Sequence, residues 1–175
     1  MLQIKSRPLK LIISEEEIAL RLKELASRIE KDFAQPFVVV GLLKGAFVFT
    51  ADLIRHFSLP VKVDFMWVSS YGSSQESQGH IKLIKDLDMN IEGEKVLLVD
   101  DILDTGYTLK EVYHILKLKG AKEIRTCVLL DKKERRKVSF EVDYVGFEVP
   151  NFFLVGYGLD WDEEGRNLRG VYAVL

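Results

Sequence analysis

Acidic and hydroxyl residues are concentrated in the middle of the chain, directly after an apolar run. Residues 96–99 read Val-Leu-Leu-Val, Asp100 and Asp101 follow, and residues 104–108 read Asp-Thr-Gly-Tyr-Thr. A buried strand that ends here would place both carboxylates at the edge of an open α/β sheet, where ligands bind. Backbone amides at the start of a following helix, with the two threonine hydroxyls as further donors, would form a phosphate site.

Carboxylates beside a phosphate site repel the phosphate unless they contact something else. Vicinal hydroxyls, a divalent cation, or both are suitable partners, so the pattern predicts a sugar phosphate with a free diol. The nucleoside triphosphate pattern G-x-x-x-x-G-K-[ST] and the dinucleotide pattern G-x-G-x-x-G are both missing from the chain. Each residue alone is more typical of a strand end or a helix cap than of a site, and only the combination favours a binding site.

The flanking segments predict how these residues are positioned. Ser14 and Glu17 form a capping box before a helix expected at 15–33. We expect further strands at 37–40, 61–68, 96–99 and 124–130, and further helices at 47–54 and 109–118. Strands that are apolar on both faces and joined by helices are typical of parallel sheets. We therefore predict an α/β fold with a twisted, mostly parallel sheet flanked by helices on both faces.

Two segments interrupt this alternation. Residues 69–80 are rich in Ser and Gly and separate two strands of one domain, so we expect a mobile lid. Residues 138–175 contain short aromatic segments without a helical period, and we expect them to form a small C-terminal hood with the N-terminal segment. The chain 1–175 is then a single domain with a core at about 15–137.

The composition excludes several classes of protein. The chain has 175 residues, 47% of them hydrophobic and 30% charged, which is unlike a disordered chain. Its net charge of −2 gives no overall field that favours nucleic acid or an anionic membrane. Cys127 is the single cysteine, which excludes a disulfide framework and a cysteine zinc site. Because no apolar run could span a bilayer and no signal peptide is visible, we expect a cytoplasmic protein.

The segment 96–108 resembles the ribose-phosphate signature of the type I phosphoribosyltransferases. From about residue 37 to the C-terminus the chain is similar to the hypoxanthine (hypoxanthine-guanine) phosphoribosyltransferases in particular. The matching motifs are Leu-Lys-Gly at 43–45, Ser-Tyr-Gly at 70–72, Leu-Asp-Lys at 130–132, Asp-Tyr-Val-Gly-Phe-Glu-Val-Pro at 143–150 and Val-Gly-Tyr-Gly-Leu-Asp at 155–160. The last two motifs indicate the purine subgroup.

This resemblance implies roles for residues at the matching positions. The ribose and its 5′-phosphate would be bound by Asp100, Asp101, Asp104, Thr105, Gly106, Tyr107 and Thr108, with Asp104 near purine N7 as general base or acid. Pyrophosphate would be bound by Leu43, Lys44, Gly45 and Arg166, with a cis bond between Leu43 and Lys44. The purine would be bound by Lys132, Phe153, Leu154 and Asp160. Ser70 and Tyr71 would belong to the lid, and Asp100, Asp101 and Asp160 would contact Mg²⁺.

The resemblance also implies the reaction. Phosphoribosyl pyrophosphate and hypoxanthine or guanine would give IMP or GMP and pyrophosphate, with Mg²⁺, in a homodimer or homotetramer that binds no nucleic acid and no membrane. Xanthine is a possible additional base. Lys132 would donate to the purine 6-oxo group, so adenine with its 6-amino donor should be rejected. Two alternatives are a regulator that senses the activated sugar and binds RNA, and a phosphoribosyl pyrophosphate synthetase, which would need a longer chain.

Three positions depart from the family pattern. Asp100 stands where purine members more often have Glu, Asn151 where an acid is usual, and Gly165 where an aromatic residue is usual. The last two changes suggest a looser hood near Arg166. The basic run 132–137 could contact RNA or phosphate, but we interpret it as a solvated turn after a strand.

Overall fold

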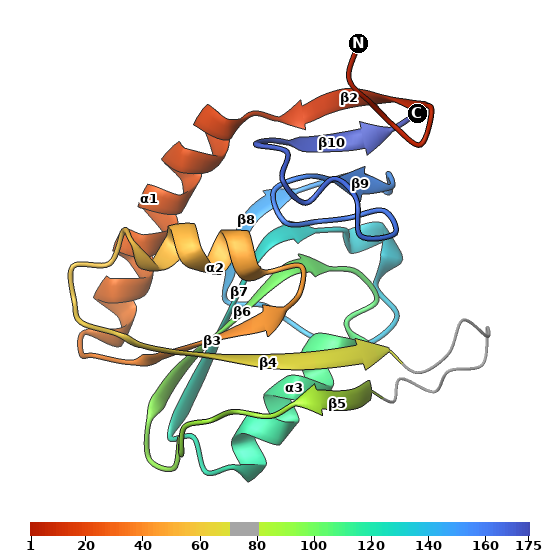
Figure 1. Ribbon diagram of the computed structural model, residues 1–175. Helices are drawn as coiled ribbons and strands as arrows, with labels where there is room; N and C mark the ends of the chain where they lie inside the picture. Colours follow the sequence, from red (N-terminus) through yellow and green to blue (C-terminus); the bar gives the residue numbers. More distant parts are fainter. Residues whose placement is uncertain (71–80) are drawn as a thin grey trace.

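A six-stranded sheet forms the centre of the molecule (Figure 1). The computed structural model describes residues 1–70 and 81–175. The strand order is β5-β4-β3-β6-β7-β8, with bounds β3 (Val38–Leu43), β4 (Lys62–Ser70), β5 (Ile81–Lys85), β6 (Lys95–Leu103), β7 (Glu123–Asp131) and β8 (Tyr144–Glu148). All are parallel except β5, which is antiparallel to β4. The predicted mostly parallel sheet is therefore confirmed.

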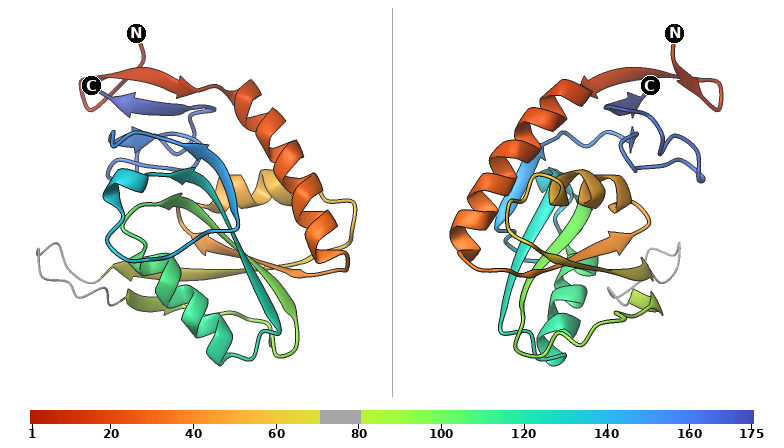
Figure 2. Two further views of the ribbon diagram at one scale, coloured as in Figure 1. Left: turned by 180° about the vertical axis from the view of Figure 1, so that it is seen from behind. Right: turned by 60° about the vertical axis from the view of Figure 1, so that its left-hand side comes forward.

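Helices cover both faces of this sheet, as predicted. They are α1 (Glu15–Phe33), α2 (Phe47–Ile54) and α3 (Tyr107–Leu118). Figures 1 and 2 show α1 and α2 on one face and α3 on the other. In β6, Leu97 and Val99 belong to the cluster that contains α1 and α2, whereas Val96 and Leu98 belong to the cluster that contains α3. Alternate residues of a strand face opposite sides, so a strand covered on both faces is apolar throughout.

The capping box predicted for α1 is present. The Ser14 hydroxyl accepts a hydrogen bond from the Glu17 backbone N–H (3.1 Å), and the Glu17 carboxylate accepts one from the Ser14 N–H (2.8 Å). These bonds satisfy amides that have no partner inside the helix. The helix ends at Ala34, which has a left-handed backbone with φ 55°. Within the described part of the chain, no helix is long and apolar enough to cross a bilayer.

A second, smaller sheet lies beside the first (Figure 1). Its strands are β1 (Gln3–Ile4), β2 (Arg7–Ile13), β10 (Val171–Val174) and β9 (Leu154–Val155), in that order and antiparallel. This sheet combines strands from the beginning and from the end of the chain. The predicted start of the hood at residue 138 is wrong, because β8 pairs in parallel with β7 and completes the main sheet. The hood strands come only from residues before 14 and after 153.

Strand β6 is longer than its sequence pattern predicts. The apolar run covers only 96–99, but the strand continues through Asp100 and Asp101 to Leu103, because pairing with β7 continues to Leu103 opposite Asp131. The predicted lid at 69–80 falls mostly on residues outside the described part of the chain. Ser70 ends β4, whereas Tyr71 is not described. Cys127 is completely buried in β7.

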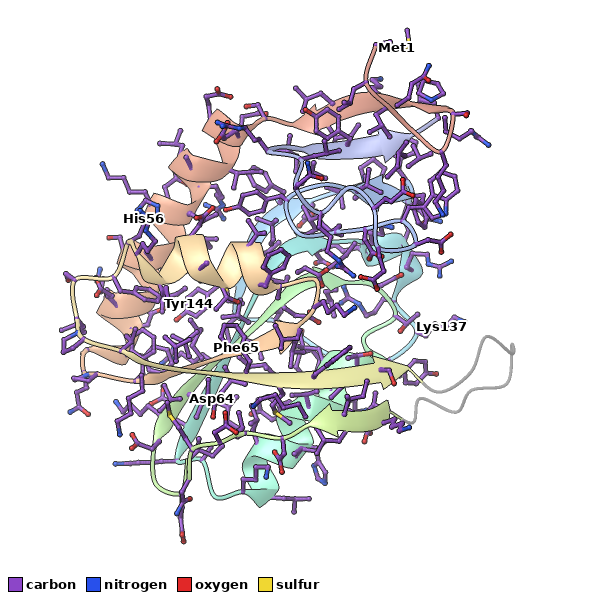
Figure 3. The ribbon with its side chains drawn as sticks, viewed as in Figure 1. Met1, His56, Asp64, Phe65, Lys137 and Tyr144 are labelled. Atoms are coloured by element: carbon purple, nitrogen blue, oxygen red, sulfur yellow. The ribbon has the colours of Figure 1, made fainter. Side chains whose placement is uncertain are left out.

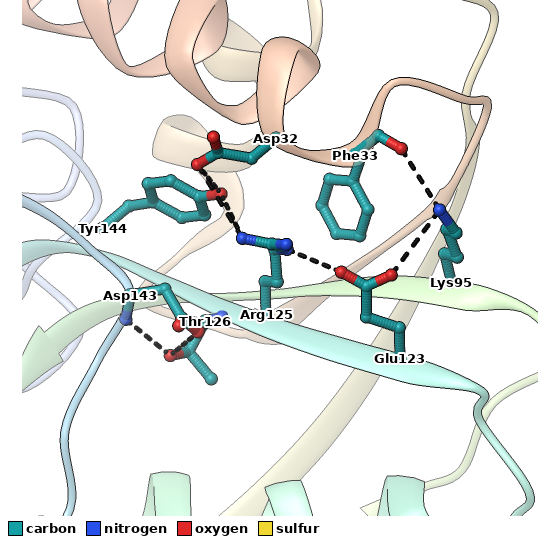
Figure 4. A network of polar contacts seen from close by, with 8 residues as sticks. All are labelled: Asp32, Phe33, Lys95, Glu123, Arg125, Thr126, Asp143 and Tyr144. Carbon is teal, nitrogen blue, oxygen red and sulfur yellow. Dashed lines mark hydrogen bonds and ion pairs between the residues drawn. The ribbon is translucent and has the colours of Figure 1, made fainter.

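A network of paired charges lies at the end of the main sheet where the parallel strands begin (Figure 4). The Tyr144 hydroxyl donates to Asp32 at the end of α1 (2.7 Å), and the Arg125 guanidinium lies 3.8 Å from the same carboxylate. Arg125 also donates to Glu123 (2.7 Å), which lies 3.6 Å from the Lys95 ammonium. Each charged group in this network thus has an opposite charge beside it.

Candidate active site

A cavity of about 330 Å³ opens at the carboxyl end of β6. It is lined by Leu42, Leu43, Gly45, Val68, Asp100, Asp101, Ile102, Leu103, Asp104, Thr105, Gly106, Thr108 and Leu109. In Figure 3 the labelled Lys137 lies near this end of the strands. Its backbone N–H donates to the Thr105 carbonyl (2.9 Å). The cavity brings together the sugar and phosphate residues expected from the sequence, except Tyr107, which is not part of the lining.

Asp100 and Asp101 place two carboxyl groups side by side in this cavity. Burial and the neighbouring Asp101 raise the pKa of Asp100 well above its ordinary value, and burial also raises the pKa of Asp101. The Arg166 guanidinium opposes the rise at Asp101. Desolvation and mutual repulsion both disfavour the charged forms. A ligand that donates hydrogen bonds or carries positive charge would relieve both effects.

The loop before α3 has the geometry of an anion site. Gly106 has a φ of +92°, and a Cβ there would lie 3.0 Å from the Val138 side chain. Only glycine adopts this backbone without strain. No side chain caps α3, and its first turn holds no acidic residue. The first amides of a helix have no partner within it, so this turn presents free N–H groups and the positive end of the helix dipole.

The loop after β3 packs directly against the acid pair. Its Leu43–Lys44 peptide bond is cis, as the resemblance implies. A Cβ on Gly45 would lie 2.0 Å from Asp101 Oδ2, so a side chain at this position would collide with the carboxylate. The Lys44 ammonium reaches away to Glu163 (3.1 Å) and lies 5.3 Å from the centre of the Trp67 ring. Leu43 and Gly45 line the cavity, whereas Lys44 does not.

A second cavity of about 400 Å³ adjoins the first. It is lined by Ile102, Asp104, Lys132, Arg135, Asn151, Phe152, Phe153, Leu154, Leu159 and Asp160. Phe153 is 54% exposed and meets Trp161 edge to face, with ring centres 5.7 Å apart. An exposed aromatic ring beside a cavity is available to stack on a flat ligand.

Lys132 supplies a cation to this second cavity. It is 9% exposed, at the end of β7, and its backbone N–H donates to the Leu103 carbonyl of β6 (3.0 Å). Burial lowers the pKa of its ammonium, and the Asp104 carboxylate opposes this effect. A buried ammonium is a strong donor for an acceptor on a ligand.

Ile102 and Asp104 line both cavities, so the two cavities together form one divided site. The first part combines adjacent acids with an anion site, and the second combines an exposed aromatic ring with a cation. Asp104 lies at the division. Arg135 donates through Nε to Asp104 Oδ1 (3.0 Å), which leaves the second carboxylate oxygen for a ligand. The arrangement suits a sugar phosphate that reacts with a flat heterocycle near Asp104.

The predicted hood residues form a separate ion-pair cluster. Arg166 lies 3.1 Å from Asp160, donates to the Gly158 carbonyl (2.8 Å) and lies 3.4 Å from Glu163. Its Nε is buried without a hydrogen-bond partner. In residues 1–70 and 81–175, no group of three His, Cys, Asp or Glu side chains could hold a metal without other ligands. Asp160 thus does not join Asp100 and Asp101 in such a group, and it faces Arg166.

The interpretation of the basic run 132–137 as a solvated turn holds for Lys133, Glu134, Arg135 and Lys137, which are exposed, but not for the whole run. Lys132 is buried, and Arg135 contacts Asp104. Arg136 is paired with the buried Asp131 and donates to the Asp104 carbonyl (3.2 Å). Lys132, Arg135 and Arg136 thus lie near Asp104, whereas Lys133 pairs with Glu148. The one signal in the sequence that could have pointed to Arg135 and Arg136 is that the run directly follows a strand predicted to be parallel to the one before the acidic loop.

Comparison with known proteins decides the family. The family model described as "Phosphoribosyl transferase domain" matches residues 12–162. The chain belongs to the phosphoribosyltransferase family. The Aquifex aeolicus hypoxanthine-guanine phosphoribosyltransferase is 61% identical over 176 residues, covering 99% of each chain. The Bacillus subtilis protein of the same name is 47% identical, covering 91% of this chain and 89% of the relative.

Solved structures agree with this phosphoribosyltransferase assignment. A Bacillus anthracis hypoxanthine-guanine phosphoribosyltransferase, with a HEPES molecule in its active site, superimposes with a TM-score of 0.91 at 46% identity and covers 95% of this chain and 98% of its own. A Trypanosoma cruzi hypoxanthine phosphoribosyl transferase gives a TM-score of 0.92 at 40% identity, covering 99% and 95%. These likenesses extend over the hood as well as the core.

Proposed function

We propose that this phosphoribosyltransferase acts in purine salvage, moving the 5-phosphoribosyl group of phosphoribosyl pyrophosphate to hypoxanthine or guanine. The products are IMP or GMP and pyrophosphate. The observation that carries the proposal is the divided cavity, in which an anion site with two acids meets an aromatic and cationic site at Asp104. Relatives named for this activity match nearly the whole chain.

The first cavity suits the activated sugar. Amides at the start of α3 and the hydroxyls of Thr105 and Thr108 bind the 5′-phosphate, and Asp100 and Asp101 accept hydrogen bonds from the ribose hydroxyls. The backbone of residues 43–45 lies against Asp101 and binds the pyrophosphate. Arg166 is near enough to oppose the rise in the pKa of Asp101, so it adds positive charge on the same side.

The second cavity suits a 6-oxopurine. Lys132 donates to the 6-oxo oxygen, and Phe153 stacks on the ring. The Phe153 carbonyl accepts from the Val174 N–H of β10 (2.9 Å). Carbonyls alternate in direction along a strand, so the Leu154 carbonyl points away from β10 and can accept from the 2-amino group of guanine. Adenine would place a 6-amino donor against Lys132 and leave both groups without acceptors.

Asp104 carries the proton transfer. Its free oxygen takes the proton from purine N7 while N9 forms a bond to C1′ and the bond from C1′ to the pyrophosphate oxygen breaks. The electron pair of that bond leaves with pyrophosphate. Positive charge develops on the ribose and negative charge on the leaving group, so cations around the pyrophosphate stabilise the transition state.

The acid pair also fits Mg²⁺, which prefers oxygen ligands and commonly shares them with substrate phosphates. Burial raises the pKa of both carboxyl groups, and a bound cation would favour their charged forms. Asp100 and Asp101 would hold the ion with oxygens of the substrate, and Asp160 would contribute if it left Arg166. Bound magnesium supplies charge neutralisation of the leaving group.

A single assay tests this proposal. The protein is incubated with phosphoribosyl pyrophosphate and Mg²⁺ and with hypoxanthine, guanine, xanthine, adenine or uracil in turn, and nucleotide formation is followed by absorbance. We expect turnover of hypoxanthine and guanine and none of adenine or uracil, while the xanthine rate measures how well the site accepts a 2-oxo group. Failure to consume any base, or a preference for adenine, would contradict the proposal. We further propose at least a dimer, which sedimentation velocity would detect.

A further inference from the structure

A buried tyrosine ties the hood to the helix that follows the pyrophosphate loop. The Tyr157 hydroxyl donates to Asp52 Oδ2 on α2 (2.5 Å), and Tyr157 is only 6% exposed. Burial and the Asp52 carboxylate raise the pKa of the hydroxyl, so it stays a donor at neutral pH. Ile18 and Leu22 of α1 line the same hollow as both residues. Glu15, Arg55 and His56 also line it, so losing this hydrogen bond would free the Asp52 carboxylate to turn toward other polar groups.

The backbone around Tyr157 has a strained conformation. Gly156, Tyr157 and Gly158 have consecutive φ values of +99°, +51° and +99°. An aromatic residue rarely adopts a positive φ, and such a conformation persists only where surrounding contacts enforce it. Here the Tyr157 N–H donates to the Leu168 carbonyl (2.8 Å) and the Gly158 N–H donates to the Arg166 carbonyl (3.0 Å). The Tyr157 hydroxyl makes a further contact outside the hood, in addition to the ion pair of Glu163 with Lys44.

This turn touches the pyrophosphate loop. A Cβ on Gly158 would lie 2.4 Å from the Gly45 carbonyl oxygen, so the two backbones are in close contact. The Gly158 carbonyl also accepts from Arg166 (2.8 Å). Helix α2 begins at Phe47, directly after the loop, and Asp52 lies on this helix. The turn and the loop are thus joined twice, once by backbone contact and once by the hydrogen bond between Tyr157 and Asp52.

We propose that Tyr157 and Asp52 are positioning residues for the pyrophosphate group: their hydrogen bond holds the 156–158 turn, and with it Arg166, against the backbone of residues 43–45. The inference rests on the proposed assignment of that loop to pyrophosphate. It predicts an effect on the two substrates that carry the diphosphate and none on the purine. A hydrogen bond that only stabilises the core would not separate the substrates in this way.

The chain offers a matched control. Tyr144 is also buried, and its hydroxyl also donates to an aspartate on a helix, Asp32, but at the opposite end of the sheet. Tyr157→Phe and Tyr144→Phe each remove one hydroxyl and keep the ring. We expect both variants to lower the melting temperature by a similar amount, about 2–5 °C. Only Tyr157→Phe should change how the diphosphate is bound.

The experiment measures KM for phosphoribosyl pyrophosphate and for hypoxanthine in the forward direction and KM for pyrophosphate in the reverse direction, well below the melting temperature. We expect Tyr157→Phe to raise both diphosphate KM values about 5–10-fold and to leave the hypoxanthine KM within about twofold. Asp52→Ala should raise the two diphosphate KM values in the same way. Asp52→Asn keeps an acceptor oxygen, so its diphosphate KM values should lie close to those of wild type. Tyr144→Phe should change none of the three constants.

Two outcomes would overturn the inference. The first is unchanged diphosphate KM values in Tyr157→Phe, and the second is an equal rise for the diphosphates and hypoxanthine. A wild-type protein that catalyses no transfer would instead refute the proposed function. If Tyr157→Phe does not fold, Asp52→Ala and Asp52→Asn decide the question by the same constants.

Discussion

The two ends of the main sheet, where its parallel strands begin and where they end, arrange their charged residues in different ways. Where the strands begin, Asp32, Arg125, Glu123 and Lys95 alternate in sign, and each lies beside an opposite charge (Figure 4). Where the strands end, Asp100 and Asp101 are like charges side by side, and the Nε of Arg166 is buried without a partner. At the first end each of these charges is paired within the protein. At the second, Asp104, Asp131 and Asp160 each pair with an arginine, but Asp100 and Asp101 form no ion pair with the described residues and can take a ligand.

This difference separates structural groups from functional ones by a physical criterion. A buried polar group without a partner costs folding free energy, and a protein tolerates that cost where a substrate later provides the partner. Removing a side chain from the first end should therefore reduce stability and spare activity. Removing one from the second end should reduce activity and spare or improve stability.

The largest expected effect is that of Asp104→Asn. The amide cannot take the purine proton, so we expect kcat to fall by about 10²–10⁴-fold with substrate binding largely kept. Steady-state kinetics with hypoxanthine measures this. Asp32→Asn, at the other end, is the control and should keep a kcat close to wild type. A near-normal rate for Asp104→Asn would remove the residue from the mechanism.

Lys132→Met should have the next largest effect. It removes the donor to the 6-oxo group but keeps an apolar side chain of similar length, so we expect the KM for hypoxanthine to rise about 10–100-fold. The KM for phosphoribosyl pyrophosphate should change much less. Lys95→Met is the matched control. Equal losses for both substrates would refute the contact with the 6-oxo group.

Where the strands begin, Arg125→Met should act on stability. It leaves Asp32 and Glu123 without the guanidinium between them, and we expect the free energy of unfolding to fall by about 1–2 kcal/mol. Urea denaturation followed by circular dichroism measures this change. The kcat of the folded protein should be unaffected. A large loss of kcat would show that the two ends are not functionally separate.

The smallest effect, and the one opposite in sign, is expected for Asp100→Asn. Burial and Asp101 raise the pKa of Asp100 in the folded protein, so its stabilising contribution is present below the ordinary pKa of an aspartate and is lost as the pH rises through the raised value. The neutral amide avoids this loss. We expect the ligand-free variant to melt about 2–4 °C higher than wild type near pH 7, with a smaller difference near pH 4. A variant that melts lower than wild type at pH 7 would contradict this account.

The sequence was sufficient to predict the elements whose patterns are local. The capping box of Ser14 and Glu17 and the apolar face of the helix at 15–33 were visible within one segment, as was the buried run 96–99. Strand β8 was assigned to the hood because Tyr144–Glu148 carries no strong pattern, and only its pairing with β7 shows where it belongs. The extension of β6 to Leu103 also depends on a neighbouring strand.

The same limit applies to the site. Asp100, Asp101 and the loop 104–108 are contiguous, so it could be predicted before the fold was known that they would share one cavity. Arg135 meets Asp104 from a turn that lies 31 residues further along the chain. The pairing of Asp160 with Arg166 likewise arises only when the hood folds. Charge balance between distant segments is a tertiary property, which local patterns do not contain.

Labelling of Cys127 can report transient unfolding of the main sheet. Its side chain is buried in the core between the sheet and helices α1 and α2, and burial raises the pKa of the thiol, so alkylating reagents should not reach a reactive thiolate while β7 is in place. As the single sulfhydryl, it gives one labelling event per chain. The rate of labelling therefore measures how often the centre of the sheet comes apart, without any engineered probe.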